Sequence, residues 1–242
     1  MLRWYRSAAA SVVAAFFISG AASAVPITYS SQASFLAAVG TSITDDYSNA
    51  GYTRSFGPNP PNFMTDAYMS SVLGQTRYVD TMFPNHNEVI GPLNLTGNPY
   101  FCSGCNGSVD LFFNNTSLSV GGGVFGVSFN YRNGGLPGAA NTGFDFFVTF
   151  ADGTTWDYVP ALSGASGPGG FAPDFFGMTS SIPIADIYFG DHHNASMSTI
   201  FGLDNLTIAN SKVQVPEPLT LGVFGVGLAG IAALRRRRAA RA

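Results

Sequence analysis

The chain has 242 residues, with 11 Lys and Arg, 14 Asp and Glu, and 21 Phe. Only four of the basic residues lie between Val25 and Pro218, against all 14 acidic ones, so this segment has a formal charge of −10. Nucleic-acid binding needs clustered Lys and Arg, and this balance argues against it. Cations, neutral sugars and protein surfaces remain as partners. The scarcity of Lys and Glu beside abundant Phe, Gly and Thr favours short strands over long exposed helices.

The first 24 residues have the three parts of a secretory signal peptide. Arg3 and Arg6 form a positive segment, residues 8–18 form an apolar run, and positions 22–24 supply a small-residue cleavage site. We therefore expect export, with a mature chain that starts near Val25. Removal of this signal and of the C-terminal tail leaves about 190 residues, enough for one domain with a core.

The mature region is expected to open with a strand over residues 26–29 and a short helix over 31–40. Ser31 is a possible N-cap, and Gly40 marks the end of the helix. Its apolar face is expected to hold Phe35, Leu36 and Val39. We expect no other clear helix in the domain.

Alternation of apolar and polar residues predicts short strands through the rest of the domain. A hairpin over 144–158, with a turn at Asp152 and Gly153, gives the strongest signal. Residues 49–62 and 160–173 are rich in Pro or Gly and are expected to be loops. The other expected strands span residues 41–47, 76–83, 108–113, 124–131, 175–180, 184–189 and 200–208.

About eight to ten short strands with little helix predict an all-β fold, an antiparallel β-sandwich of the jelly-roll type. A Greek-key, immunoglobulin-like sandwich is the alternative, although the Cys, Trp, Cys spacing of that fold is absent. We expect a signal peptide over residues 1–24, one domain over 25–209, and a linker and tail over 210–242.

The two cysteines, Cys102 and Cys105, are separated by two residues. In an exported protein this spacing most simply indicates a small disulfide that closes a loop. A redox site would need a following helix to lower the thiol pKa, whereas the next residues have the pattern of a strand. A zinc site would need two more ligands, and no second pair with this spacing exists.

Residues 191–194, Asp-His-His-Asn, form the densest group of potential metal ligands, with His86 elsewhere in the chain. The alternative is a polar loop between strands. If the group binds an ion, Asp and Asn oxygens suit calcium better than zinc. No motif of a hydrolase or metalloprotease is present, and the adjacent Asp45 and Asp46 would point to opposite faces of a strand. We expect no enzymatic activity.

The last 28 residues form a tail with three parts. Residues 215–218, Val-Pro-Glu-Pro, precede an uncharged apolar run over 219–234 and then four consecutive arginines. Sixteen helical residues span roughly 24 Å, slightly less than the roughly 30 Å hydrocarbon core of a bilayer. The arginines favour the cytoplasmic side, which places everything before Val215 outside. The alternative, a buried helix of a soluble domain, would need a polar face, and the run offers only Thr220.

At these residues the chain resembles the PEP-CTERM family of exported bacterial proteins, whose tails are processed by the membrane protease exosortase. The resemblance implies that Pro216, Glu217 and Pro218 are the recognition motif and that residues 219–234 are a single transmembrane helix. It also implies a retention signal formed by Arg235, Arg236, Arg237 and Arg238. The protein would be anchored transiently in the inner membrane with its C-terminus in the cytoplasm, and would then reach the cell surface or the medium.

The last expected strand also resembles the last strand of several carbohydrate-binding and PEP-CTERM jelly rolls. This resemblance implies that Asp204 helps to hold a structural calcium ion. The alternative is a β-bulge formed by Asp204 and Asn205 at the edge of a sheet.

Together these features predict a non-enzymatic protein of the cell surface or the exopolysaccharide matrix. One alternative is a calcium-assisted carbohydrate-binding module in which exposed aromatic side chains, such as Trp156 and Tyr158, stack on sugar rings. Another alternative is a hydrolase that acts on matrix polysaccharide.

Overall fold

The computed structural model describes residues 26–55, 62–91, 99–103, 107–133, 145–158, 174–190 and 201–212. These residues form two helices, α1 (Gln32–Ala38) and α2 (Asp66–Leu73). They also form the strands β1 (Ile27–Tyr29), β2 (Val39–Asp45), β3 (Arg54–Ser55), β4 (Arg77–Asp80), β5 (Asn87–Ile90), β6 (Tyr100–Ser103), β7 (Val109–Phe112), β8 (Val124–Asn133), β9 (Asp145–Phe150), β10 (Thr155–Tyr158), β11 (Asp174–Gly190) and β12 (Phe201–Ser211).

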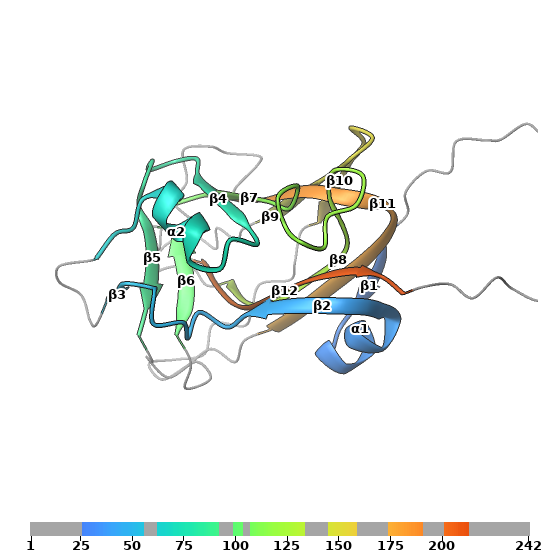
Figure 1. Ribbon diagram of the computed structural model, residues 1–242, viewed down its shortest axis with the longest axis horizontal. Helices are drawn as coiled ribbons and strands as arrows, with labels where there is room; N and C mark the ends of the chain where they lie inside the picture. Colours follow the sequence, from blue (N-terminus) through green and yellow to red (C-terminus); the bar gives the residue numbers. More distant parts are fainter. Residues whose placement is uncertain are drawn as a thin grey trace, which may run out of the picture.

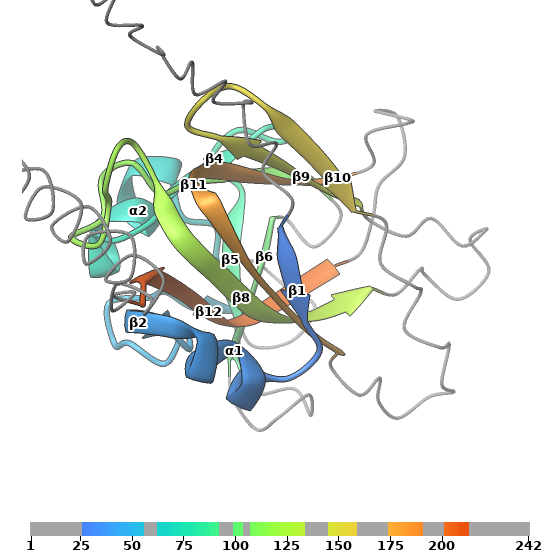
Figure 2. The same ribbon diagram turned by 90° about the vertical axis from the view of Figure 1, so that its right-hand side faces the viewer.

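The strands form two layers that share the long strand β11 (Figures 1 and 2). The first half of β11 pairs with β1 and β8, and its second half pairs with β7 and β9. The first layer has the order β1-β11-β8-β12-β2, and the second layer has the order β10-β9-β11-β7-β4. Strands β6, β5 and β3 continue from β12 at one end of the fold. The register of β11 shifts between Ile184 and Asp186, directly after Pro183, where the strand passes from one layer to the other.

Large apolar side chains of both layers fill the space between them. Phe129 of β8 contacts Phe146 of β9 and Phe189 of β11 edge to face, and all three are fully buried. Such contacts add about 0.5–1.5 kcal/mol to the burial of apolar area. The alternation predicted for residues 108–113, 124–131 and 144–158 is confirmed, because one set of alternate residues in each segment lies in this core.

Helix α1 packs on the outer face of the first layer. Ser31 caps it by accepting a hydrogen bond from the backbone N–H of Ser34. Phe35 is buried over Gly126 of β8, where an added Cβ would lie only 3.2 Å from its ring. The prediction that Leu36 lies on the apolar face of this helix is wrong, since its side chain is 42% exposed. Gly40 does not end the helix either, because β2 begins at Val39 and includes Gly40 as it pairs with β12.

Helix α2 corrects the prediction of a single helix. The side chain of Thr65 accepts a hydrogen bond from the backbone N–H of Tyr68 at 3.1 Å, and the helix ends at Gly74 in the left-handed conformation. These are ordinary start and stop signals. The segment between them lacks a clear apolar stripe, and Met69 is its one buried residue. Its weak amphipathic pattern explains why the sequence did not predict it.

The all-β class is confirmed, and every pair of described strands is antiparallel except β3 with β5. The two strands predicted over 175–180 and 184–189 are the halves of β11, whereas β3, β5 and β6 were not predicted. Strand β3 falls inside the segment 49–62 that was predicted to be a loop. The jelly-roll type stays a prediction. Among the described residues, no helix has the length and apolarity that a membrane span requires. The expected signal peptide and apolar tail helix lie outside those residues.

Candidate functional site

The described chain begins and ends at the same side of the fold (Figure 1). Ile27 at the start of β1 and Lys212 after β12 line one open groove of about 700 Å³, together with residues of α1, β2, β8 and β11. The Nζ atom of Lys212 donates a hydrogen bond to the carbonyl oxygen of Ala37 at 3.0 Å, which ties the end of β12 to α1. The described chain therefore ends on this side, opposite β3, β5 and β6 (Figure 1).

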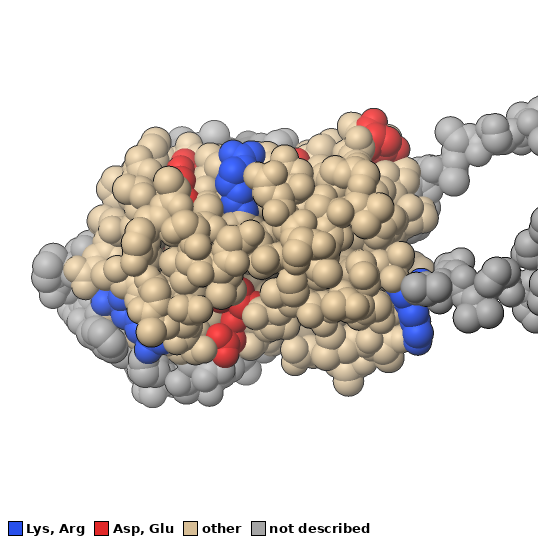
Figure 3. All heavy atoms as spheres, viewed as in Figure 1, with Lys and Arg blue, Asp and Glu red and all other residues tan. Residues whose placement is uncertain are grey.

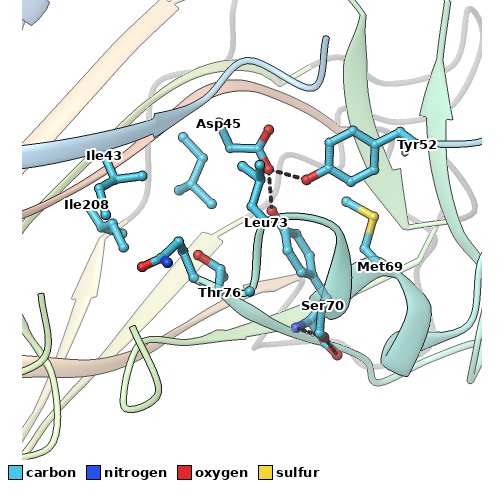
Figure 4. A pocket seen from close by; sticks show the side chains of 12 residues that line it. Ile43, Asp45, Tyr52, Met69, Ser70, Leu73, Thr76 and Ile208 are labelled. Carbon is cyan, nitrogen blue, oxygen red and sulfur yellow. Dashed lines mark hydrogen bonds between the residues drawn. The ribbon is translucent and has the colours of Figure 1, made fainter. Parts of the chain in front are cut away.

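A buried carboxylate surrounded by tyrosines lies where β2 meets α2 and β4 (Figure 4). The Oδ1 atom of Asp45 accepts a hydrogen bond from the backbone N–H of Tyr47 at 2.9 Å. Its Oδ2 atom accepts one from the hydroxyl of Tyr52 and a longer one, at 3.5 Å, from the hydroxyl of Tyr78. The carboxylate thus joins a loop and a strand that are more than 25 residues apart in the chain.

Burial raises the pKa of Asp45, and the hydrogen bonds from Tyr52 and Tyr47 partly offset this effect. Burial also raises the pKa of Tyr47 and of Tyr78 well above its usual value, so both hydroxyls stay protonated and can donate. Tyr47 has a φ of 55°, a left-handed conformation that is unfavourable for a bulky residue. The hydrogen bond from its N–H to Asp45 and its complete burial stabilise this conformation.

The cavity beside this cluster has a volume of about 10 Å³, the room of about one water molecule. Its polar walls come from Asp45, Tyr52, Ser70 and Thr76 (Figure 4). A cavity of this size cannot hold a substrate. We interpret the cluster as a structural one that attaches α2 and β4 to β2.

Two carboxylates on the outer face of the second layer were not singled out by the sequence. Asp110 of β7 and Asp186 of β11 are diagonal neighbours, because Asp110 pairs with Tyr188 and Asp186 pairs with Phe112. Burial and the charge of Asp186 raise the pKa of Asp110 to about 7, whereas Arg77 lowers it. Burial raises the pKa of Asp186 as well. Neither of the two cavities described above includes this pair.

Cys102 lies in β6, is completely buried and is disulfide-bonded. Its sulfur lies 4.0 Å from Oε2 of Glu88, the residue that it faces on β5. Cys105 lies outside the described residues, so the pairing of the two cysteines stays a prediction.

Asp204 lies in β12 and is 6% exposed. Its Oδ1 atom accepts a hydrogen bond from the N–H of Asn205, which has a φ of 53°, and the register with β8 shifts between Asp204 and Thr207. The predicted β-bulge is therefore confirmed. Its predicted place at a sheet edge is wrong, because β12 pairs with β8 on one side and with β2 and β6 on the other. The role of Asp204 in calcium binding stays a prediction, and within the described ranges no three His, Cys, Asp or Glu side chains converge.

The aromatic residues expected to stack on sugars are not fully exposed. Trp156 and Tyr158 are half-buried and pack against the core, with the Tyr158 ring 4.9 Å from that of Phe176. They extend the core at the edge of the second layer, so the prediction that they are exposed is wrong. Three of the predicted features lie outside the described residues. They are residues 191–194, the sorting motif at Pro216, Glu217 and Pro218, and the arginines from Arg235 to Arg238.

Residues 214–238 match the family model described as the PEP-CTERM protein-sorting motif. The match includes the proline-containing motif, the apolar run and the four arginines, and it confirms the family that the tail resembles. The motif implies that the protein is exported and that exosortase processes it. No curated protein and no solved structure matches the chain.

Proposed function

We propose that this protein, delivered by its PEP-CTERM motif, is a non-enzymatic component of the cell surface or the exopolysaccharide matrix. The match of residues 214–238 to the sorting motif carries the proposal. In this proposal residues 219–234 cross the inner membrane with the C-terminus in the cytoplasm, and the arginines from Arg235 to Arg238 hold that orientation. Cleavage near Pro218 then frees the domain.

The geometry of the domain fits delivery from such a tail. Strand β12 ends at Ser211, three residues before the matched motif begins. The anchored domain would stand with its open groove toward the membrane and with β3, β5 and β6 away from it. The charge of −10 between Val25 and Pro218 disfavours adsorption to anionic lipid and keeps the released domain soluble.

Surface charge supports a neutral partner in the matrix. The face shown in Figure 3 is mostly uncharged, with a few separate acidic and basic groups. Electrostatic capture of acidic polymers would need a basic patch, and a segment of net charge −10 would repel them. We therefore infer that the matrix component it contacts is uncharged rather than acidic.

Intact mass of the protein recovered from the surface and the medium of the host tests the sorting step. We expect the loss of residues 1–24 and of everything after about Pro218. A control that replaces Pro216, Glu217 and Pro218 by Ala should keep the tail. A mature wild-type species that still ends at Ala242 would contradict processing by exosortase.

The matrix role has a separate test. After removal of the cells, the processed protein should co-purify with the extracellular polysaccharide and should be released when that polymer is digested. Recovery of all processed protein as a free species in the medium would contradict a matrix role but would leave the sorting step intact.

A further inference from the structure

Polar side chains converge inside the protein where the start of α2 meets the ends of β4, β5 and β6. Asp80 ends β4, Asn87 begins β5 and Ser103 ends β6, and these residues are 3%, 0% and 0% exposed. Asp66, the first residue of α2, lies beside them. The sequence does not suggest this cluster, because its members come from four separate segments.

The amide of Asn87 has a defined orientation. Its Nδ2 atom donates to Oδ1 of Asp66 at 2.6 Å and to the carbonyl oxygen of Met64 at 3.4 Å. A flipped amide would place an oxygen against these two acceptors. The Oδ1 atom of Asn87 is therefore held on the other side of the amide, where it is buried and has no hydrogen-bond partner.

The carboxylate of Asp80 also has one unpaired oxygen. Its Oδ1 atom accepts hydrogen bonds from the backbone N–H groups of Met82 and Phe83. Its Oδ2 atom is buried without a partner. The hydroxyl of Ser103 lies within reach of two acceptors, the carboxylate of Asp80, whose pKa its hydrogen bond lowers, and the carbonyl oxygen of Ser108 at 3.2 Å. The hydroxyl has one proton, so when it donates that proton to Ser108 its Oγ atom presents a lone pair to the cluster.

No Lys or Arg side chain among the described residues pairs with the negative charge in this cluster. Asp66 lies close to Asp80, since its Oδ1 atom accepts a hydrogen bond from the backbone N–H of Asp80 at 3.3 Å. Arg54 donates to Ser48, Arg77 lies over Phe112 and Lys212 donates to Ala37. The ring of His86, the residue before Asn87, lies with its Nδ1 atom 3.1 Å from the carbonyl oxygens of Phe83 and Pro84.

These oxygens need a donor or a cation, because a buried acceptor without a partner retains its full desolvation penalty. A water molecule could donate to two of them but would leave the carboxylate charge uncompensated. A hard cation would satisfy the oxygens and neutralise the charge. A ligand set of carboxylate, amide and hydroxyl oxygens, without nitrogen or sulfur, is the set that calcium prefers.

We propose that Asp80, Asn87 and Ser103 bind a calcium ion through Oδ2, Oδ1 and Oγ, with Asp66 as an outer carboxylate that orients Asn87. Water molecules and backbone oxygens would complete the coordination shell. The ion would join the turn after β4 to β5 and β6, at the end of the domain that lies away from the tail. This site shares no residue with the predicted site at Asp204 and does not depend on the proposed matrix role.

Thermal unfolding of the full chain, purified in detergent and stripped with EDTA, tests the site. Titration with calcium chloride should raise the Tm in a saturable way, with a Kd of about 0.1–1 mM, as is typical of extracellular calcium modules. Magnesium chloride at the same ionic strength should raise it much less, because magnesium requires a stricter octahedral geometry.

Asp80→Asn is the decisive variant. The remaining oxygen can still accept from Met82 and Phe83, and the new amide group can donate into the cluster, so the variant should be at least as stable as the wild type in EDTA. Its affinity for calcium, measured by isothermal titration calorimetry, should fall at least tenfold. Asp152→Asn removes the same charge from an exposed turn and should bind calcium as the wild type does.

Three outcomes would overturn the proposal. Wild-type protein with no response to calcium would mean that the cluster holds water. Unchanged affinity in Asp80→Asn would place any bound ion elsewhere. Loss of binding in Asp204→Asn, together with unchanged binding in Asp80→Asn, would assign the ion to β12.

Discussion

Phe129 of β8 meets Phe189 of β11 edge to face across the two layers, with ring centroids 5.1 Å apart. The same ring contacts Phe176 at 5.5 Å, and Phe176 lies in the other half of β11. One side chain therefore contacts both halves of the strand that the two layers share. The packing of the sandwich and the path of β11 depend on the same aromatic residue.

We expect Phe129→Ala to lower the free energy of unfolding by about 3–5 kcal/mol, because it leaves a cavity against both halves of β11. Urea denaturation followed by tryptophan fluorescence would measure the loss. Leu36→Ala is the matched control, since Leu36 is 42% exposed, and it should change stability by less than about 0.5 kcal/mol. Similar losses in the two variants would mean that Phe129 does not hold the layers together.

Tyr52→Phe removes the hydroxyl that donates to the buried carboxylate of Asp45. A hydrogen bond to a charged group contributes about 1.5–3 kcal/mol, and we expect a loss of that size at pH 7. Tyr68→Phe removes the same atom from a side chain that is 47% exposed and donates to the carbonyl oxygen of Gly51. It should cost less than about 1 kcal/mol.

Chemical denaturation at pH 7 and at pH 4.5 would compare these two tyrosine variants. The loss in Tyr52→Phe should be smaller at pH 4.5, because the raised pKa of Asp45 leaves more of this carboxyl neutral there. An equal loss for Tyr52→Phe and Tyr68→Phe at pH 7 would argue against a special role of the buried carboxylate.

Strands with one buried and one solvated face were predictable. Successive side chains of a strand point to opposite faces, so apolar and polar residues alternate along it. That is why residues 108–113, 124–131 and the hairpin over 144–158 were predicted. Strand β5 was not, since its polar residues Asn87 and Glu88 are 0% and 6% exposed. Their environment comes from α2 and β6, which no local pattern reveals.

The candidate sites also differ in whether the sequence alone could reveal them. The sorting tail is contiguous, so its three parts were visible in the sequence and match the family model. The cluster of Asp66, Asp80, Asn87 and Ser103 exists only after four segments fold together. The bulge at Asp204 was predicted from adjacent residues, but its place inside the sheet depends on β2, β6 and β8.

Stability is expected to fall as the pH rises from 4 to 7, partly because of Asp110. In the folded protein burial and Asp186 raise the pKa of Asp110 to about 7, against 3.8 for a free side chain. The folded state therefore keeps a proton in this range that the unfolded chain has lost, and each step up in pH favours unfolding until about pH 7. Above that pH the effect is complete and the contribution stays constant.

Asp110→Asn should remove the part of the slope of stability against pH that comes from Asp110. It should also stabilise the protein at pH 8 by about 1–2 kcal/mol, after allowance for solvent screening of a partly exposed group. Urea midpoints from pH 4 to 8 would measure it. Some slope should persist, because the pKa of Asp45 and of Asp186 is raised as well. Asp152→Asn should leave the slope between pH 4 and 7 in place, since the pKa of Asp152 is lowered by Thr154. A slope unchanged in Asp110→Asn would mean that Asp110 stays charged in the folded protein.

Replacement of Arg235, Arg236, Arg237 and Arg238 by Ala should impair retention and processing of the tail. The apolar run over 219–234 is slightly short for a bilayer, so its position in the membrane depends on the charges that follow it. Without them a single basic residue, Arg241, follows the run. We expect a smaller fraction of processed protein by intact mass, and a C-terminal tag that becomes accessible to external protease.

The same four positions changed to Lys give the matched control. Lys keeps the positive charge but replaces the planar guanidinium with a compact ammonium group. Normal processing of the Lys variant and defective processing of the Ala variant would show that charge alone retains the tail. A defect in both would mean that a partner recognises the guanidinium groups themselves, and normal processing in both would contradict a retention role for the cluster.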